Sequence, residues 1–247
     1  MDLSTSTANI KPDNSIVPAI TDVKPDRTVQ SAPVMNAIQP NLTNELLSHI
    51  PSFYRSSIVN IVNVEGDGNC GFRSIAVGLG MQENRWPQIR KELGENLEKN
   101  SEFYISLWNE KDYYDYLEVT RWEDGSCGVE KWMIMPDFGS IIANTFQRPV
   151  IYISRNQCIT FVPHMNYDSD NMSLAIAYLD PSRHFVSIRI RPNAAIPPIA
   201  TSWRPHANEE AIQWETHFTK EIREFNRLLE ESNVTIAITD KIVDVDV

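Results

Sequence analysis

Residues 65–74 read EGDGNCGFRS and place Cys70 directly after a glycine-rich turn. The preceding segment 56–64, SSIVNIVNV, is apolar and rich in β-branched residues, which predicts a largely buried strand. From Cys70 onward, apolar residues recur at spacings of three and four as far as Leu79, which predicts a helix. We therefore expect a strand, a tight turn and a helix whose first residue is a cysteine.

This position suits a reactive thiol. A sulfur at the first turn of a helix faces the positive end of the helix dipole and unpaired backbone N–H groups, so we expect the pKa of Cys70 to be lowered. Glycines at 66 and 68 allow the backbone to turn sharply. The N–H groups of Asp67, Gly68 and Asn69 would then form a concavity that binds a developing oxyanion.

A cysteine nucleophile also requires a base. The chain has five histidines, at positions 49, 164, 184, 206 and 217. His184 is the candidate because it follows the turn DPSR and opens the predicted strand HFVSIRI at 184–190, where a rigid element would hold its side chain. Strand alternation places it on the face of Val186, and we expect that face to meet the Cys70 helix.

The remaining pattern predicts one large domain with tails. Residues 1–42 are rich in Ser, Thr, Asn, Pro and Asp and predict a disordered tail, 43–231 the folded domain, and 232–247 a tail or short strand. Further helices are expected near 44–50, 86–97, 101–117, 136–146 and 208–229, and further strands near 149–153, 157–162 and 173–179. The segment from Asn208 reads as one long amphipathic helix.

Composition limits the classes of function. The formal charge is −11 and the pI is near 4.9, which argues against a nucleic-acid partner. Three cysteines without a CxxC pair argue against a structural zinc site and indicate a reducing compartment. Cys127 reads as a surface thiol and Cys158 as a core residue. The sequence contains neither a signal-peptide pattern nor a spanning apolar stretch, so we expect an intracellular, cytoplasmic or nuclear protein without membrane contact.

These residues resemble a known family. DGNCGFRS is similar to the nucleophile motif of the ovarian-tumour (OTU) cysteine proteases, which are papain-like deubiquitinases. The resemblance continues, more weakly, in KWMIMPDFGSIIA, in SRNQCITFVPH and in RHFVSIRIRPNAAIPPIATSW, and covers about residues 50–230. It is closest to the OTU-like domains of plant, fungal and transposon-derived proteins. It implies an α+β fold of papain-like OTU type, with a central, mainly antiparallel sheet flanked by helices.

The resemblance also assigns roles. Cys70 matches the nucleophile, His184 the general base and Asp67 the motif aspartate, and no metal or organic cofactor is implied. Many family members carry Asn or Asp two residues after the histidine to orient its ring. This chain has Val186 there, so we expect Asp67 or Asp180 to replace it, a choice that the sequence leaves open.

Two functions follow from the resemblance. The first is a monomeric cysteine-type deubiquitinase that hydrolyses isopeptide bonds of ubiquitin or ubiquitin-like conjugates. The second is an OTU-fold module, of transposon origin, that binds ubiquitin with weak or no catalysis, an alternative suggested by Val186. A calcium loop of EF-hand type does not fit the spacing of GDGNCGF.

Overall fold

The computed structural model describes residues 40–243 and the side chains from 44 to 233. The tail expected at 1–42 lies outside the described residues as far as position 39, and Pro40–Ser48 forms helix α1. None of the described helices is both long enough and apolar enough to cross a bilayer.

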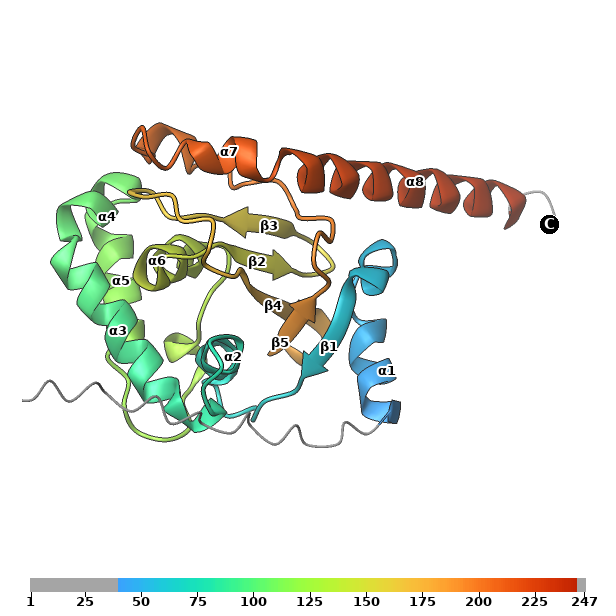
Figure 1. Cartoon of the computed structure of the whole chain (residues 1–247). Helices are drawn as coiled ribbons and strands as arrows, with labels where there is room; N and C mark the ends of the chain where they lie inside the picture. The colour runs from blue at the N-terminus through green and yellow to red at the C-terminus, as the bar shows by residue number, and fades with distance from the viewer. Residues whose placement is uncertain (1–39, 244–247) are drawn as a thin grey trace, which may run out of the picture. The chain divides into compact units, whose positions relative to one another are not determined.

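A five-stranded sheet forms the centre of the fold, with the strand order β1-β5-β4-β2-β3 (Figure 1). The strands are β1 Ile58–Val62, β2 Val150–Ile153, β3 Cys158–Phe161, β4 Leu174–Leu179 and β5 His184–Ile190. The β2–β4 pair is parallel, and the β1–β5, β5–β4 and β2–β3 pairs are antiparallel. The expected α+β class with a mainly antiparallel sheet is confirmed.

Helices cover both faces of the sheet (Figure 1). The α-helices after α1 are α2 Cys70–Gly78, α3 Trp86–Lys99, α4 Ser101–Leu107, α5 Glu110–Thr120, α6 Asp137–Phe146, α7 Gln213–His217 and α8 Thr219–Val243. Short 3₁₀ helices lie at η1 Ser52–Ser57, η2 Glu83–Arg85, η3 Val129–Lys131, η4 Asp180–Ser182 and η5 Arg204–His206.

Strand alternation divides the buried side chains into two cores. In β2, Val150 and Tyr152 join one core, whereas Ile151 and Ile153 join the other. Alternation of this kind follows from the pleat, which turns successive side chains to opposite faces. Because both faces are apolar and covered, the central strands read as nearly continuous hydrophobic runs in the sequence.

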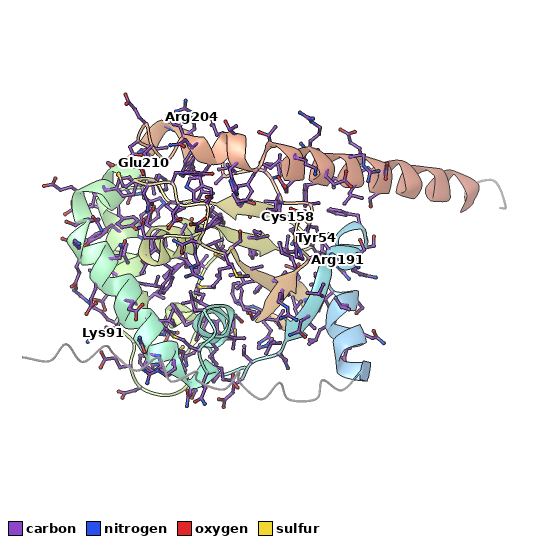
Figure 2. All side chains as sticks on the ribbon, in the orientation of Figure 1. Tyr54, Lys91, Cys158, Arg191, Arg204 and Glu210 are labelled. Carbon is purple, nitrogen blue, oxygen red and sulfur yellow. The ribbon has the colours of Figure 1, made fainter. Side chains whose placement is uncertain are left out.

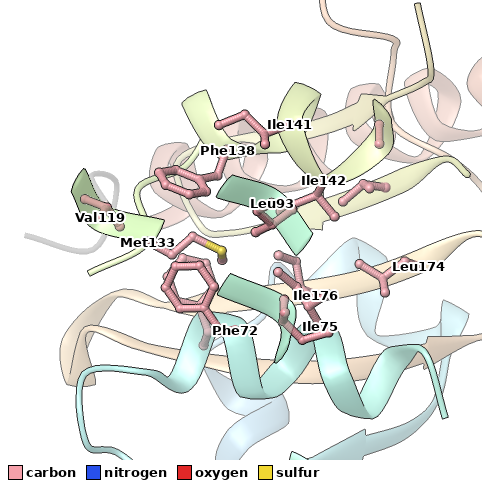
Figure 3. Packing of buried hydrophobic residues seen from close by; sticks show 14 of the residues in the cluster. Phe72, Ile75, Leu93, Val119, Met133, Phe138, Ile141, Ile142, Leu174 and Ile176 are labelled. Atoms are coloured by element: carbon pink, nitrogen blue, oxygen red, sulfur yellow. The ribbon is translucent and has the colours of Figure 1, made fainter. Parts of the chain in front are cut away.

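The first core lies between the sheet and helices α2, α3, α5 and α6. Phe72 and Ile75 of α2 meet Leu93 of α3 and Phe138 of α6 there (Figure 3). The rings of Phe72 and Phe138 pack edge to face, with centroids 5.9 Å apart. This core fixes α2, the helix that begins with Cys70, against the sheet.

The second core lies on the opposite face, against η1, α7 and α8. Tyr54 is fully buried there, and its hydroxyl donates a 2.9 Å hydrogen bond to the carbonyl of Ala195. Cys158 packs at the edge of this core, where Figure 2 labels it near Tyr54. Val186 and Ile188 of β5 belong to it as well.

The C-terminal segment differs from the sequence expectation in two ways. The single helix expected from Asn208 is interrupted at Phe218, which separates α7 from α8. Asn208 instead accepts a hydrogen bond from the N–H of Ala211 in the turn before α7. The helix then continues to Val243, through part of the stretch 232–247 for which a tail or short strand was expected.

Candidate active site

Cys70 is the first residue of α2, as the sequence predicts, and its side chain is buried. Helix α2 packs against β5, and the backbone N–H of Phe185 acts on the Cys70 sulfur by lowering its pKa. The sulfur therefore lies against the backbone at the N-terminal end of β5.

His184, the first residue of β5, directly precedes this contact. Its Nε2 atom lies 2.9 Å from Oδ1 of Asn63, the residue that follows β1. Its Nδ1 atom faces the turn that leads to Cys70, since a Cβ atom built on Gly66 would lie 3.7 Å from it. The structure thus brings Cys70 and His184 to one end of the sheet, together with Asn63, which the sequence analysis missed.

The expected orientation of β5 was wrong. Strand alternation in the sequence predicts that the face of Val186 meets the Cys70 helix, but Val186 belongs to the core on the opposite side of the sheet, and Phe185 faces α2. His184 nevertheless lies near the turn before Cys70, because it stands at the very end of the strand. A side chain at a strand end can reach past the sheet edge, whereas one in the middle cannot.

Asp67 organises the turn itself. Its carboxylate accepts hydrogen bonds from the N–H of Asn69 at 2.9 Å and from Nη2 of Arg73 at 2.6 Å. No hydrogen bond joins Asp67 to His184 within residues 40–243. Asp180, the other orienting residue considered, accepts a 3.2 Å bond from Asn156 instead. Neither aspartate therefore holds the His184 ring.

A buried arginine supports the same turn from the other side. Arg90 of α3 is fully buried and donates from Nη2 and Nε to Oδ1 of Asn69, at 2.8 and 3.1 Å. It also donates to the carbonyls of Val119 and Lys131. Asn69 in turn donates to Asp67 at 3.1 Å and to the carbonyl of Gly125 at 2.8 Å. The backbone before Cys70 is consequently fixed by a continuous polar network.

This network changes the predicted oxyanion site. The N–H of Asn69 is donated to Asp67 Oδ1, so it is not free to bind an oxyanion, contrary to the expectation from the sequence. The cause is the side chain of Asp67, which closes a turn with the residue two positions on. The N–H groups of Asp67 and Gly68 have no hydrogen-bond acceptor among the described residues and remain candidates.

The electrostatics also differ from the sequence expectation. Burial raises the pKa of the Cys70 thiol, and the N–H groups of Phe185 and Gly71 oppose the rise without cancelling it. Burial lowers the pKa of His184, while the Val64 carbonyl acts in the opposite direction. Cys70 and His184 share no hydrogen bond in the described part of the chain. Both shifts favour the uncharged form of the group, the thiol and the neutral imidazole.

Burial also acts on the groups around the pair. It would raise the pKa of Asp67, but hydrogen bonds from Arg73 and Asn69 outweigh it and hold that pKa below the usual value. Burial lowers the pKa of Arg90 to about 10, which keeps the guanidinium charged at neutral pH. A charged guanidinium and an ionised carboxylate thus hold the turn in place.

The raised thiol pKa gives a test that needs no substrate. We expect the rate of Cys70 alkylation by iodoacetamide to rise with pH and to show its inflection above pH 9, because only the thiolate reacts and the ordinary value is 9.0. Peptide mass mapping over a pH series would separate Cys70 from Cys127 and Cys158. A plateau of Cys70 reactivity between about pH 6 and 8 would instead indicate a preformed thiolate–imidazolium pair.

A groove of about 270 Å³ opens at Cys70. Gly68, Cys70 and Gly71 line it, together with mainly apolar and aromatic side chains. Arg183 stacks on Trp132 at one side, with its guanidinium carbon 4.9 Å from the ring centroid.

The sequence matches no family model, and no curated protein matches it either. The structure is similar to solved OTU domains. The OTU domain of OTUD1 shares 12% identity with a TM-score of 0.41, and the similarity covers 52% of this chain and 84% of that one. The viral OTU protease of Dera Ghazi Khan virus shares 15% identity with a TM-score of 0.38, covering 54% and 81%.

A third similar structure is the Hazara virus OTU bound to ubiquitin. It shares 15% identity with a TM-score of 0.39, and the similarity covers 58% of this chain and 88% of that one. Similarities as distant as these concern the fold and carry no argument about chemistry. The class that the fold and site define is an α+β domain with a cysteine at a helix start and a histidine at an adjacent strand start.

Proposed function

We propose that the chain is a cysteine-type deubiquitinase that hydrolyses isopeptide bonds of ubiquitin or ubiquitin-like conjugates. The observation that carries the proposal is that Cys70 lies against the N-terminal end of β5, which begins with His184, and lines a mainly apolar groove. We propose that it acts inside the cell, as a monomer and without a metal or organic cofactor.

Chemistry at this site would proceed in two halves. The His184 ring accepts the thiol proton, and the Cys70 sulfur attacks the carbonyl carbon of the isopeptide bond. The N–H groups of Asp67 and Gly68 bind the resulting oxyanion. The C–N bond then breaks, the imidazolium gives its proton to the leaving lysine amine, and a thioester remains. Water, deprotonated by His184, cleaves the thioester to release a carboxylate and the free thiol.

The raised pKa of Cys70 defines how His184 must work. With a neutral thiol at rest, proton transfer accompanies attack on the substrate, so His184 acts as a true general base. Burial lowers the pKa of His184, which favours the unprotonated ring that can accept this proton. The two opposite shifts are therefore compatible with turnover.

A second function is favoured by a specific observation. The absence of a Cys70–His184 hydrogen bond in the described residues, together with the buried thiol, also suits an OTU-fold module that binds ubiquitin without turnover. The two functions predict different behaviour of the same groove. An enzyme forms a covalent bond through Cys70, whereas a binding module holds ubiquitin only non-covalently.

The deciding experiment is a reaction of the purified chain with ubiquitin that carries a thiol-reactive electrophile at its C-terminus, followed by intact mass measurement. We expect one adduct with the wild type and none with Cys70→Ala. Cys158→Ala is the control, because it removes a thiol that packs against the opposite core, away from the Cys70 turn, and it should react like the wild type.

Each outcome separates the candidates. A Cys70-dependent adduct, followed by cleavage of ubiquitin dimers, supports the deubiquitinase. A folded chain that forms no adduct but binds ubiquitin non-covalently would favour the binding module. A folded chain that does neither would overturn ubiquitin as the partner.

A further inference from the structure

We infer that Asn63 is the residue that positions His184 for catalysis, an inference that rests on the proposed function and deepens it. The orienting position two residues after the histidine holds Val186, which cannot accept a hydrogen bond. Asn63 supplies the missing acceptor from a different strand, since its Oδ1 lies 2.9 Å from His184 Nε2.

The pairing of β1 with β5 explains how a residue so distant in sequence reaches the ring. The two strands are antiparallel, with Val62 opposite Ser187, so the chain just beyond Val62 runs alongside the start of β5. Ile61 of β1 and Val186 of β5 belong to the same core. By alternation, Asn63 and His184 project on that same face. The β1–β5 ladder ends at Val62 and Ser187, and the two side chains meet just beyond its end.

The contact determines which ring nitrogen carries the proton. An amide oxygen only accepts hydrogen bonds, so His184 must present Nε2–H to Asn63 Oδ1. In the neutral ring the other nitrogen, Nδ1, is then unprotonated. Nδ1 lies on the side of Gly66, toward the turn that ends at Cys70. The Val64 carbonyl also accepts from the ring, so we infer that Asn63 holds the single proton of the neutral ring on Nε2, which leaves Nδ1 able to accept the thiol proton.

Asn63 has no other evident structural task. It is exposed, and its side chain makes no second hydrogen bond within the described residues. Asp67 and Asp180 are both bonded elsewhere, to Arg73 and Asn156 respectively. Replacing Asn63 should consequently change the histidine more than the stability of the fold.

The test compares three variants by their steady-state kinetics on ubiquitin with a fluorogenic C-terminal group. Asn63→Leu, which is similar in size but accepts no hydrogen bond, should lower kcat on the order of 100-fold with little change in KM, because loss of tautomer control impairs the base rather than binding. Asn63→Asp restores an acceptor and should stay within about 10-fold of the wild type. Asn60→Leu changes the same residue type within β1, without a side-chain hydrogen bond, and should behave as the wild type.

A second readout keeps this inference separate from the proposed function. Nitrogen-15 NMR of the His184 ring, at a pH where it is neutral, should show the Nε2–H tautomer in the wild type and in Asn60→Leu, and a mixture in Asn63→Leu. An inactive wild type that still shows this change would sink the deubiquitinase but retain the positioning role. Unchanged kcat together with an unchanged tautomer in Asn63→Leu would overturn the inference.

Discussion

Arg90→Met is expected to destabilise the fold on the order of 3 kcal/mol, because it leaves several buried acceptors without a donor. The guanidinium is fully buried and serves Asn69, Val119 and Lys131. It also stacks on Phe72, with its central carbon 3.8 Å from the ring centroid. Methionine can fill the volume but donates no hydrogen bond. The variant no longer buries a charged guanidinium, which is a gain in stability, but this gain offsets only part of the stability lost with the hydrogen bonds.

The variant should also lose function beyond its loss of stability. Asn69 is the residue before Cys70, and without Arg90 its Oδ1 no longer has a fixed partner. We expect Cys70-dependent labelling by the ubiquitin probe to fall more than 10-fold even at a temperature where the variant is folded, since misplacement of a nucleophile by about 1 Å has effects of that size. Urea unfolding and labelling rate are the two measurements.

Lys91→Met provides the matched control. Lys91 is the next residue on α3, lies at the surface (Figure 2) and makes only a 3.8 Å ion pair with Glu95. Its replacement should change the free energy of unfolding by less than about 0.5 kcal/mol. If Arg90→Met were no less stable than Lys91→Met and labelled at the wild-type rate, the network would have no part in holding the turn.

The sequence predicts the nucleophile and the base because each belongs to a local pattern. The pattern of residues 56–79 predicts a strand, a glycine-rich turn and the start of a helix. His184 follows a tight turn and begins a strand. Both elements form as expected. The local pattern cannot give the face of β5 that meets α2, because both faces of that strand are apolar and both are covered.

The supporting residues depend on contacts between distant parts of the chain. Asn63 meets His184 only because β1 pairs with β5, a pairing that no local pattern specifies. The sequence does contain a signal that Arg90 is buried. Arg90 lies at spacings of four from Trp86 and three from Leu93, on the apolar stripe of α3, where a charged residue indicates burial with partners.

The pKa of Cys70 illustrates competition between two effects of its position. The helix start and nearby N–H groups favour the thiolate, as the sequence analysis expects. The same packing that holds α2 against β5 also removes water from the sulfur, and this burial is the larger effect. The sequence motif around Cys70 does not show how deeply the sulfur is buried, so it cannot predict the direction of the pKa shift.

Gly68→Ala is expected to have the largest local effect at the nucleophile turn. Gly68 adopts φ +89°, which is strained for any residue with a Cβ atom. A Cβ atom there would also lie 2.4 Å from the carbonyl oxygen of Cys127 and 2.8 Å from Trp132 Nε1. The oxygen belongs to the backbone, and Cys127 is tied to the turn by its own N–H, which donates to Asp67 at 2.9 Å. The loop therefore cannot move away without breaking this bond.

Gly80→Ala separates strain from collision. Gly80 has a similar φ of +80°, but a Cβ atom there would meet nothing within 4 Å. It should cost only about 1 kcal/mol of unfolding free energy, the penalty of the left-handed backbone, and leave labelling of Cys70 unchanged. Gly68→Ala should lose about 2 kcal/mol more, because overpacking adds to the strain, and its labelling by the ubiquitin probe should fall about 100-fold as the oxyanion donor moves. Equal stability and equal labelling of the two variants would mean that the close contact between the turn and the Cys127 loop has no role in aligning the nucleophile.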